Sequence, residues 1–314
     1  MIKSIFHKIL IPAGISLCLV MAVGTSGATP VYQGPDVQII GSQFYQELES
    51  EFQRYSYQID ALENGVPALI LQKLPTDLNK IKSTKQRKTI FFTSLLPMIL
   101  IANDEILVER NKMVEIQQQL MVQHQLNPAQ QHIVATLAKR YKIKVHTDRP
   151  EKTIQQLLNR IDVIPADLAL AQAANESAWG TSRFSQLANN LFGQWTFTPG
   201  QGIVPEDRPE GQTYEVRKFL TVYDSVRSYL HNLNTHSAYR QLRQLRAESR
   251  LAGQNPEGSR LAEGLLRYSI RGEAYVKELQ AMIKTNHLDR FATAKLRAAR
   301  QSLADTGSFA LIQR

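Results

Sequence analysis

A mostly apolar stretch in the body of the chain, residues 91–101, is interrupted by Pro97 and is soon followed by a polar Asn-Asp-Glu triplet at 103–105. Such a triplet is typical of a helix start, and the apolar residues after it keep helical spacing. The pattern therefore predicts a buried helix over 91–101 and a second helix from about 103 to 125. Because eleven residues are too few to cross a membrane, we expect the first to be a core helix.

Glycine positions separate a helical part of the chain from an irregular part. No glycine occurs between Gly65 and Gly180, whereas five occur at 180, 193, 200, 202 and 211. Because glycine destabilises helices and favours turns, we expect the first stretch to be mostly helix and the second to be rich in loops. The alanine-rich segment 166–178, which follows Pro165, predicts a helix of small residues that can approach its neighbours closely.

One region, residues 213–223, alternates as a strand does, after a Glu-Gly turn signal. The apolar face of this predicted strand consists of Tyr214, Val216, Leu220 and Val222. Residues 224–225 should then cap a helix, and further helical stretches are expected over 258–270 and 272–286. Residues 29–63 are polar and aromatic, and we interpret them as a segment lying against the domain. The pattern predicts a mainly helical chain with one small β region.

Composition and charge exclude several classes of protein. The chain has 314 residues, 43% of them hydrophobic, and a net charge of +9, which favours an anionic polymer or surface as partner. Its single cysteine, Cys18, excludes a disulfide framework, a cysteine-rich zinc site and CxxC redox chemistry. Neither GxxxxGK[ST] nor GxGxxG occurs, and the seven histidines lack HExxH or similar ligand spacing. We therefore expect no cofactor and no metal.

Residues 1–28 have the features of an export signal. Two lysines precede an apolar region at 9–23, and the small residues Ser26 and Ala28 occupy the minus-three and minus-one positions of a cleavage site. We expect cleavage after Ala28 and a mature protein in the periplasm. The apolar region is shorter than the roughly 20 residues that span a bilayer. An uncleaved inner-membrane anchor facing the periplasm is the alternative.

One carboxylate is a candidate general acid. On the helix predicted at 166–178, Glu176 shares a face with Gln172 one turn before it and Trp179 one turn after it. Burial of a carboxyl beside an aromatic ring raises its pKa and keeps a proton available near neutral pH, as general acid catalysis requires. The alternative is a glutamate at a helix end that is merely solvated or capping.

Two motifs carry a resemblance to a known family. Residues 176–182 are Glu-Ser-Ala-Trp-Gly-Thr-Ser and residues 189–193 are Asn-Asn-Leu-Phe-Gly. They resemble the Glu-Ser-x-x-Gly-x-Ser and Asn-Asn-x-Phe-Gly signature of the glucosaminidase family of peptidoglycan hydrolases. The similarity covers about 160–290 and is strongest to the Bax-type subgroup of Gram-negative bacteria. It implies a lysozyme-like fold, Glu176 as the catalytic acid, and cleavage of β-1,4 bonds next to N-acetylglucosamine.

With this resemblance, the expected fold class is α+β, mainly α: a lysozyme-like helical domain with a small β-hairpin lobe and an N-terminal helical extension. The expected division is a signal peptide at 1–28, the extension at 29–150, the catalytic domain at 151–290 and a basic C-terminal tail at 291–314.

The second catalytic group is expected in the hairpin, where resemblance favours a carboxylate. The candidates are Glu206, Asp207, Glu210 and Glu215. We choose Glu215, because it lies on the predicted strand and faces away from Tyr214 and Val216. A second carboxylate would act as nucleophile or as base for an attacking water, depending on its distance from the acid. The alternative is that Glu215 forms a surface ion pair with Arg217.

The remaining candidate site residues each have a structural alternative. Tyr275, in a Tyr-Val-Lys-Glu segment similar to the Tyr-Ala-x-x motif of the family, is a candidate catalytic residue that could instead pack the helix. Asn189, Asn190, Phe192 and Trp195 could line a sugar groove through amide hydrogen bonds and ring stacking, or could close a loop over the core.

The predicted function is that of an exported peptidoglycan hydrolase of the endo-β-N-acetylglucosaminidase type. Water attacks the anomeric carbon, aided by Glu215 or by the substrate's own N-acetyl group. One alternative is a lytic transglycosylase, which typically carries a Gly-Leu-Met-Gln-like motif where this chain has 189–193. The other is a non-catalytic glycan-binding or scaffold protein.

The expected partners are peptidoglycan glycan strands and not nucleic acid. We expect a monomer and leave open an association with the membrane or with other cell-wall proteins. A basic helical stripe is interpreted as a contact for an anionic cell-wall polymer or as a solvated face. The stripe consists of Arg240, Arg243, Arg246 and Arg250.

Overall fold

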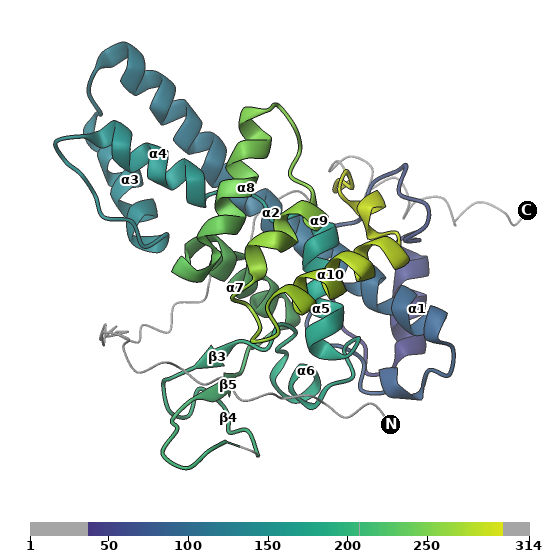
Figure 1. Cartoon of the computed structure of the whole chain (residues 1–314). Coiled ribbons are helices and arrows are strands. Elements are labelled where there is room, and N and C mark those ends of the chain that lie inside the picture. The colour runs from purple at the N-terminus through teal and green to yellow at the C-terminus, as the bar shows by residue number, and fades with distance from the viewer. Residues whose placement is uncertain (1–36, 207, 298–314) are drawn as a thin grey trace, which may run out of the picture.

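The computed structural model describes residues 37–206 and 208–297 and shows a mainly helical protein with a small antiparallel sheet at one end (Figure 1). The α+β, mainly α fold class is therefore confirmed. The expected signal peptide at 1–28 and most of the expected basic tail lie outside the described residues. The helices are α1 (Tyr45–Arg54), α2 (Thr84–Gln123), α3 (Pro128–Arg140), α4 (Pro150–Arg160), α5 (Ala166–Ser177), α6 (Arg183–Ala188), α7 (Val222–Thr235), α8 (Arg240–Leu251), α9 (Gly258–Leu261) and α10 (Glu273–Thr285). Short 3₁₀ turns lie at Leu78–Lys80, Ser237–Tyr239, Ala262–Leu265 and Leu288–Phe291.

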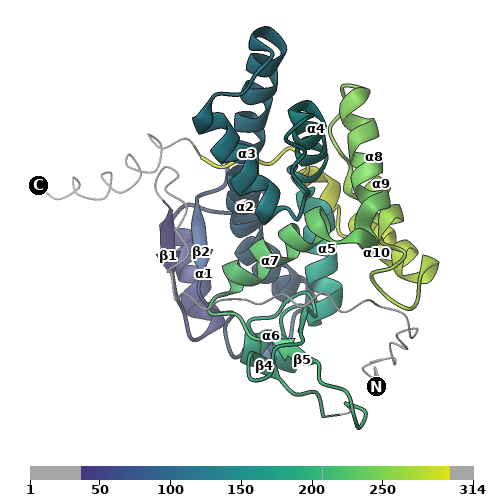
Figure 2. The same cartoon turned by 90° about the vertical axis from the view of Figure 1, so that its left-hand side faces the viewer.

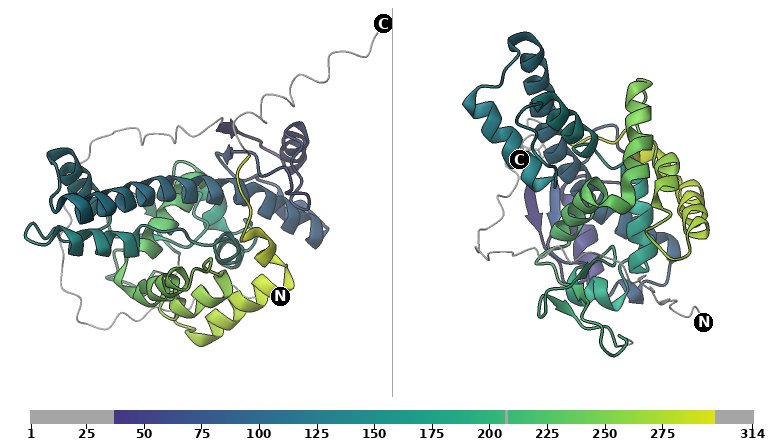
Figure 3. Two further views of the ribbon diagram at one scale, coloured as in Figure 1. Left: turned by 90° about the horizontal axis from the view of Figure 1, so that it is seen from above. Right: turned by 60° about the vertical axis from the view of Figure 1, so that its left-hand side comes forward.

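Helix α2 is one uninterrupted helix of 40 residues, so the predicted helix start at 103 is wrong (Figure 3). Asn103 does not cap a helix. Its Nδ2 donates to the carbonyl of Ile164 at 2.8 Å, and its Oδ1 accepts from the Ile164 amide at 3.0 Å. A buried amide in the middle of α2 thus satisfies the backbone of the loop that leads into α5.

The apolar stretch at 91–101 is buried, as expected of a core helix. In the part of the chain that the structure describes, α2 is the one helix whose length and composition would suit a membrane span, yet 72% of its most apolar window is buried inside the protein. Helix α2 packs against α4, α5, α7 and a short strand of the N-terminal region. It is the framework on which the other helices are assembled.

The N-terminal region shares the core of the later helices. Strands β1 (Gln38–Ile40) and β2 (Leu69–Leu71) form a parallel pair that lies with α1 beside α2 (Figure 2). One hydrophobic cluster extends from Ile40 to Phe291. Close to the end of the described chain, Leu296 forms a parallel bridge with Val66. The two regions expected as extension and catalytic domain are therefore packed on each other.

The small sheet consists of β3 (Trp195–Thr196), β4 (Gly202–Ile203) and β5 (Glu215–Arg217), in the order β3-β5-β4. The predicted strand at 213–223 is thus only three residues long. It cannot extend to residue 223, because Thr221 caps α7: the Thr221 side chain accepts from the Asp224 amide, and the Asp224 carboxylate accepts from the Thr221 amide. Such a capping box starts the helix three residues before the predicted cap at 224–225.

Half of the basic stripe on α8 is internal, so its interpretation as a polymer contact or solvated face is wrong for Arg243 and Arg246, whereas Arg240 is exposed. Arg243 and Arg246 are only 4% and 1% exposed. Arg243 donates to the carbonyls of Leu233 and His236, at the end of α7, and Arg246 donates to carbonyls that follow α4. Carbonyls at the end of a helix lack partners within the helix, and these guanidinium groups supply them.

Candidate active site

Glu176 lies in the last turn of α5, where the chain turns sharply. Ala178, Trp179 and Gly180 all have left-handed backbone angles, with φ of 49°, 60° and 77°. The Ser177 hydroxyl accepts from the Gly180 amide at 2.8 Å and donates to the Ala173 carbonyl at 2.6 Å, which closes the turn. A Cβ atom on Gly180 would lie 2.7 Å from Leu74, so this position admits only glycine without rearrangement. The Glu-Ser-x-x-Gly spacing thus describes a helix end that presents Glu176.

The carboxyl of Glu176 is partly exposed and accepts a hydrogen bond from the Tyr275 hydroxyl to Oε1 at 2.8 Å. Burial raises the pKa of Glu176 to about 7, because a desolvated carboxyl disfavours the charged form. The Tyr275 hydrogen bond opposes this shift in pKa, and the negative charge of Glu278 adds to it. The group therefore holds a proton near neutral pH, which a general acid needs.

Trp179 is not the aromatic neighbour that was expected to bury this carboxyl. Because α5 ends before it, Trp179 leaves the shared face and packs edge-on against Phe91 and Phe92, with Lys88 Nζ 4.7 Å from the ring centre. Tyr275 takes the expected place beside Glu176. Only 2% exposed, Tyr275 packs in the core, as its structural alternative expects, and its hydroxyl also contacts the candidate acid.

The second oxygen of Glu176 faces an exposed glycine. A Cβ atom built on Gly193 would lie 3.7 Å from Oε2. Gly193 is itself exposed and has a left-handed backbone, with φ of 61°. No side chain of residue 193 therefore stands between Oε2 and the surface.

Three of the four predicted sugar-groove residues are buried and close the loop instead. The Asn189 amide donates to the carbonyls of Phe219 and Leu220. That of Asn190 donates to the carbonyls of Gln194 and Arg217 and accepts from the amides of Phe192 and Gln194. The third residue, Phe192, is 2% exposed. The loop-closing alternative is the one that these contacts support, because amides used for backbone groups are not free for a sugar.

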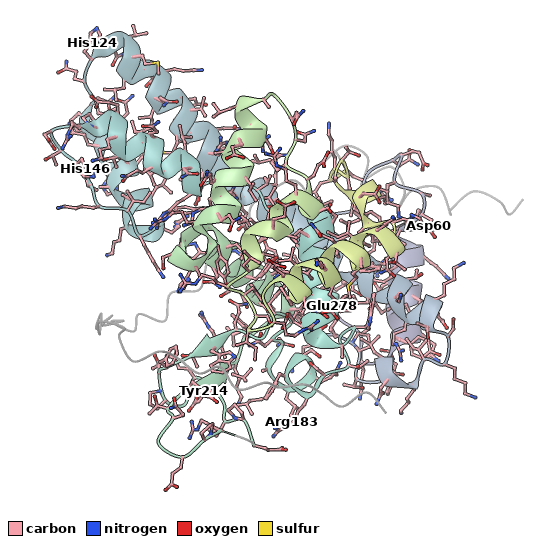
Figure 4. All side chains as sticks on the ribbon, in the orientation of Figure 1. Asp60, His124, His146, Arg183, Tyr214 and Glu278 are labelled. Atoms are coloured by element: carbon pink, nitrogen blue, oxygen red, sulfur yellow. The ribbon has the colours of Figure 1, made fainter. Side chains whose placement is uncertain are left out.

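Trp195 is the fourth of these residues, and it differs from the other three. It is partly exposed on β3, and its ring stacks on that of Tyr214 with centroids 4.0 Å apart. Figure 4 places Tyr214 in the small lobe and Glu278 toward the middle of the molecule. The lobe thus carries a pair of stacked rings at which sugar rings could stack.

The carboxylate of Glu215 points into the small β lobe and forms hydrogen bonds with its backbone. It is 7% exposed and accepts from the amides of Gly200 at 3.0 Å and Gly202 at 2.7 Å, one with each oxygen. The predicted alternative, an ion pair with Arg217, is not what the contacts show, since Arg217 contacts the Phe219 ring and the Ser228 hydroxyl. Of the other candidates, Glu206 pairs with Arg183 at 2.9 Å, Glu210 is exposed, and Asp207 lies outside the described residues.

Sequence reasoning missed Glu278, whose negative charge raises the pKa of the acid. Glu278 lies one helical turn after Tyr275 on α10 and pairs with Arg271 at 2.7 Å. In the Tyr-Val-Lys-Glu segment, Glu278 follows Tyr275 by three residues, and this helical spacing places both on one face. The sequence could therefore have indicated Glu278 as a neighbour of the site. Within the described parts of the chain, no group of three His, Cys, Asp or Glu residues is arranged to hold a metal ion.

Comparison with known proteins gives three similarities. The glucosaminidase family model, described as mannosyl-glycoprotein endo-beta-N-acetylglucosaminidase, matches residues 151–288. Protein bax of Escherichia coli (strain K12) is 35% identical over 210 residues, which cover 67% of this chain and 73% of that protein. The crystal structure of the catalytic domain of the autolysin Auto from Listeria monocytogenes matches with a TM-score of 0.32 and 18% identity, over 53% of this chain and 89% of that chain.

Proposed function

Because the chain belongs to the glucosaminidase family of glycoside hydrolases, we propose that it cleaves β-1,4 bonds next to N-acetylglucosamine in peptidoglycan, with Glu176 as the general acid. The observation that carries the proposal is the carboxyl of Glu176, whose Oε2 lies beside exposed Gly193 and whose pKa, raised to about 7, leaves about half of it protonated at pH 7. Its proton would pass to the glycosidic oxygen as the bond to the anomeric carbon breaks.

The attack of water needs assistance on the other side of the sugar. Glu215 is the carboxylate predicted for this task, but both its oxygens accept backbone hydrogen bonds inside the lobe. The substrate's own N-acetyl group is therefore the assisting group that the contacts favour. In this scheme Glu215 shapes the lobe, and the stacked rings of Trp195 and Tyr214 support the sugar chain.

The test of the proposed function is digestion of purified sacculi, followed by mass spectrometry of the muropeptides. The wild type should release products with reducing N-acetylglucosamine ends. Glu176→Gln should lower the rate by at least about 100-fold, because general acid catalysis is worth roughly 10²–10⁴. Glu263→Gln, at an exposed carboxylate of the same domain that is not a candidate for either catalytic role, is the matched control and should retain activity.

Other product patterns would contradict the proposal. Anhydro-muramic ends would indicate a lytic transglycosylase, and undigested sacculi would indicate a glycan-binding protein without catalysis. An active Glu176→Gln enzyme would assign the acid to another residue.

The site of action is a separate part of the proposal, and it depends on the signal sequence at 1–28. We expect the mature protein to begin at Thr29 in the periplasm. Cell fractionation and N-terminal sequencing test this, and an uncleaved cytoplasmic product would contradict it. An uncleaved membrane-bound product would support the anchored alternative.

A further inference from the structure

Three buried side chains from three helices are joined to Glu176 by a chain of hydrogen bonds. The Tyr229 hydroxyl on α7 donates to Oε1 of Gln172 on α5 at 2.5 Å. Nε2 of Gln172 donates to the Tyr275 hydroxyl on α10 at 2.9 Å, and that hydroxyl donates to Oε1 of Glu176 at 2.8 Å. Tyr229 and Gln172 are 0% exposed and Tyr275 is 2% exposed, so water does not compete for these bonds.

The Tyr229 hydroxyl, at the buried end of this series of hydrogen bonds, determines which group donates in each of them. A tyrosine hydroxyl has one proton, and we find no second partner for that of Tyr229 among residues 37–206 and 208–297. Its proton therefore lies on the amide oxygen of Gln172, which turns the amide NH₂ toward Tyr275. An NH₂ group can only donate, so the Tyr275 oxygen accepts and its own proton is directed to Glu176.

Stacked rings hold both tyrosines in place. The Tyr229 ring stacks on Phe192 with centroids 3.8 Å apart, and the Tyr275 ring stacks on Tyr268 at 5.5 Å. The Tyr268 hydroxyl donates to the Phe192 carbonyl at 2.9 Å, which joins the two stacks. Because the rings are fixed, what remains variable at Tyr275 is the direction of its hydroxyl proton.

That direction decides which oxygen of Glu176 carries the acidic proton. Oε1 accepts from Tyr275, so the proton of the neutral carboxyl belongs on Oε2, beside exposed Gly193. Without the Gln172 donor, the Tyr275 oxygen would be free to accept the proton of Glu176. The proton would then point into the core, away from the surface that substrate can reach.

We propose that Gln172, oriented by Tyr229, is a positioning residue that directs the acidic proton of Glu176 outward to the glycosidic oxygen. The inference rests on the proposed role of Glu176 as the acid. It assigns a role in the reaction to two buried residues that do not touch the substrate.

The main test is the double variant Gln172→Met/Tyr229→Phe. It removes both partners of a buried hydrogen bond and replaces them with apolar groups of similar shape, which is close to neutral for stability. Tyr275 and Glu176 remain in contact, but no donor now fixes the direction of the Tyr275 hydroxyl proton. Below about pH 5 the acid is protonated in every variant. At such a pH we expect the kcat of the double variant to be roughly tenfold lower than that of the wild type, with KM unchanged.

The same variant should also change the pH profile. The neutral carboxyl gains an acceptor in Tyr275, and a hydrogen bond to the neutral form raises the pKa of an acid. The alkaline limb of kcat should therefore move upward, by about one pH unit. A merely structural role for Gln172 would lower the stability but would leave this limb in place.

A second variant and a control distinguish a change in the reaction from a loss of folded protein. Gln172→Met alone should give the same kinetics at lower stability, because it leaves the buried Tyr229 hydroxyl without an acceptor. Tyr223→Phe is the matched control, since Tyr223 also lies on α7 and donates to a carboxylate, that of Glu105, at 2.9 Å. Its kcat and pH limb should remain those of the wild type.

The outcomes separate this inference from the proposed function. If Glu176→Gln is inactive but both Gln172 variants keep the wild-type kcat and pH limb, the positioning role is wrong and the proposed function stands. If Glu176→Gln remains active, the acid itself is wrongly assigned. If Tyr223→Phe moves the limb as the Gln172 variants do, the effect is not specific to the hydrogen-bond chain and the inference is overturned.

Discussion

The protonation of Glu176 can be tested by stability measurements without any substrate. Burial raises the pKa of this carboxyl from its usual 4.5 to about 7. The folded protein therefore binds one more proton than the unfolded chain between these two pH values. By linkage, the contribution of Glu176 to the free energy of unfolding must fall as the pH rises through that window.

The size of the effect follows from the shift in pKa. One pKa unit corresponds to about 1.4 kcal/mol, so ionisation of Glu176 destabilises the folded protein by at most about 3.5 kcal/mol well above pH 7. Below pH 4.5 the carboxyl is protonated in both states and the effect is absent. Glu176→Gln removes the ionisation and keeps an acceptor for the Tyr275 hydroxyl. The variant should therefore gain stability over the wild type as the pH rises.

The assay is urea unfolding of wild type and Glu176→Gln at several values between pH 4 and pH 8. The quantity of interest is the difference between the two proteins, because other titrating groups then cancel. Glu210→Gln removes one negative charge at an exposed position and is the control. A Glu176→Gln difference that stays constant across this range, or that falls with pH, would refute the reasoning.

Three further variants test other parts of the structure. Tyr275→Phe removes the hydrogen bond that lowers the pKa of Glu176, so the alkaline limb of the pH–rate profile should move upward; an unchanged or lower limb would contradict this. Asn103→Ala leaves two buried backbone groups before α5 unpaired and should lower the free energy of unfolding by at least about 2 kcal/mol in urea, whereas a loss near zero would show that α2 does not need this contact. Gly180→Ala and Gly200→Ala both place alanine at a left-handed backbone, but only at Gly180 does the new Cβ meet a neighbour, at 2.7 Å. The Gly180 variant should therefore be less stable, by about a further 1–3 kcal/mol in thermal or urea unfolding, and the reverse order would be inconsistent with the packing.

Local sequence signals were sufficient for features that depend on neighbours along the chain. The alanine-rich helix after Pro165, the core helix over 91–101 and the loop-rich region after Gly180 all follow from periodicity and from glycine positions. The Glu-Ser-x-x-Gly motif indicated Glu176 through the family resemblance, and in the structure consecutive residues build the turn that presents it. The same local rules failed where a polar side chain served a distant segment. Asn103 resembled a helix start, yet its partner is Ile164, which is 61 residues away.

The sequence by itself determined the mainly helical class, the family motifs and the candidate acid, while only the tertiary structure decided what surrounds that acid. Tyr275 and Glu176 are 99 residues apart, and their contact exists because α10 packs on α5. Arg243 and Arg246 of α8 were predicted to face solvent or polymer, but they are buried because unpaired carbonyls at the ends of two helices converge on them. The strand after Gly211 was predicted too long because its alternation continued into a segment that a capping box turns into α7. For Tyr275 and for the buried arginines the physical reason is the same: a hydrogen bond between distant segments replaces solvent, and composition and periodicity do not encode which partner will be brought near.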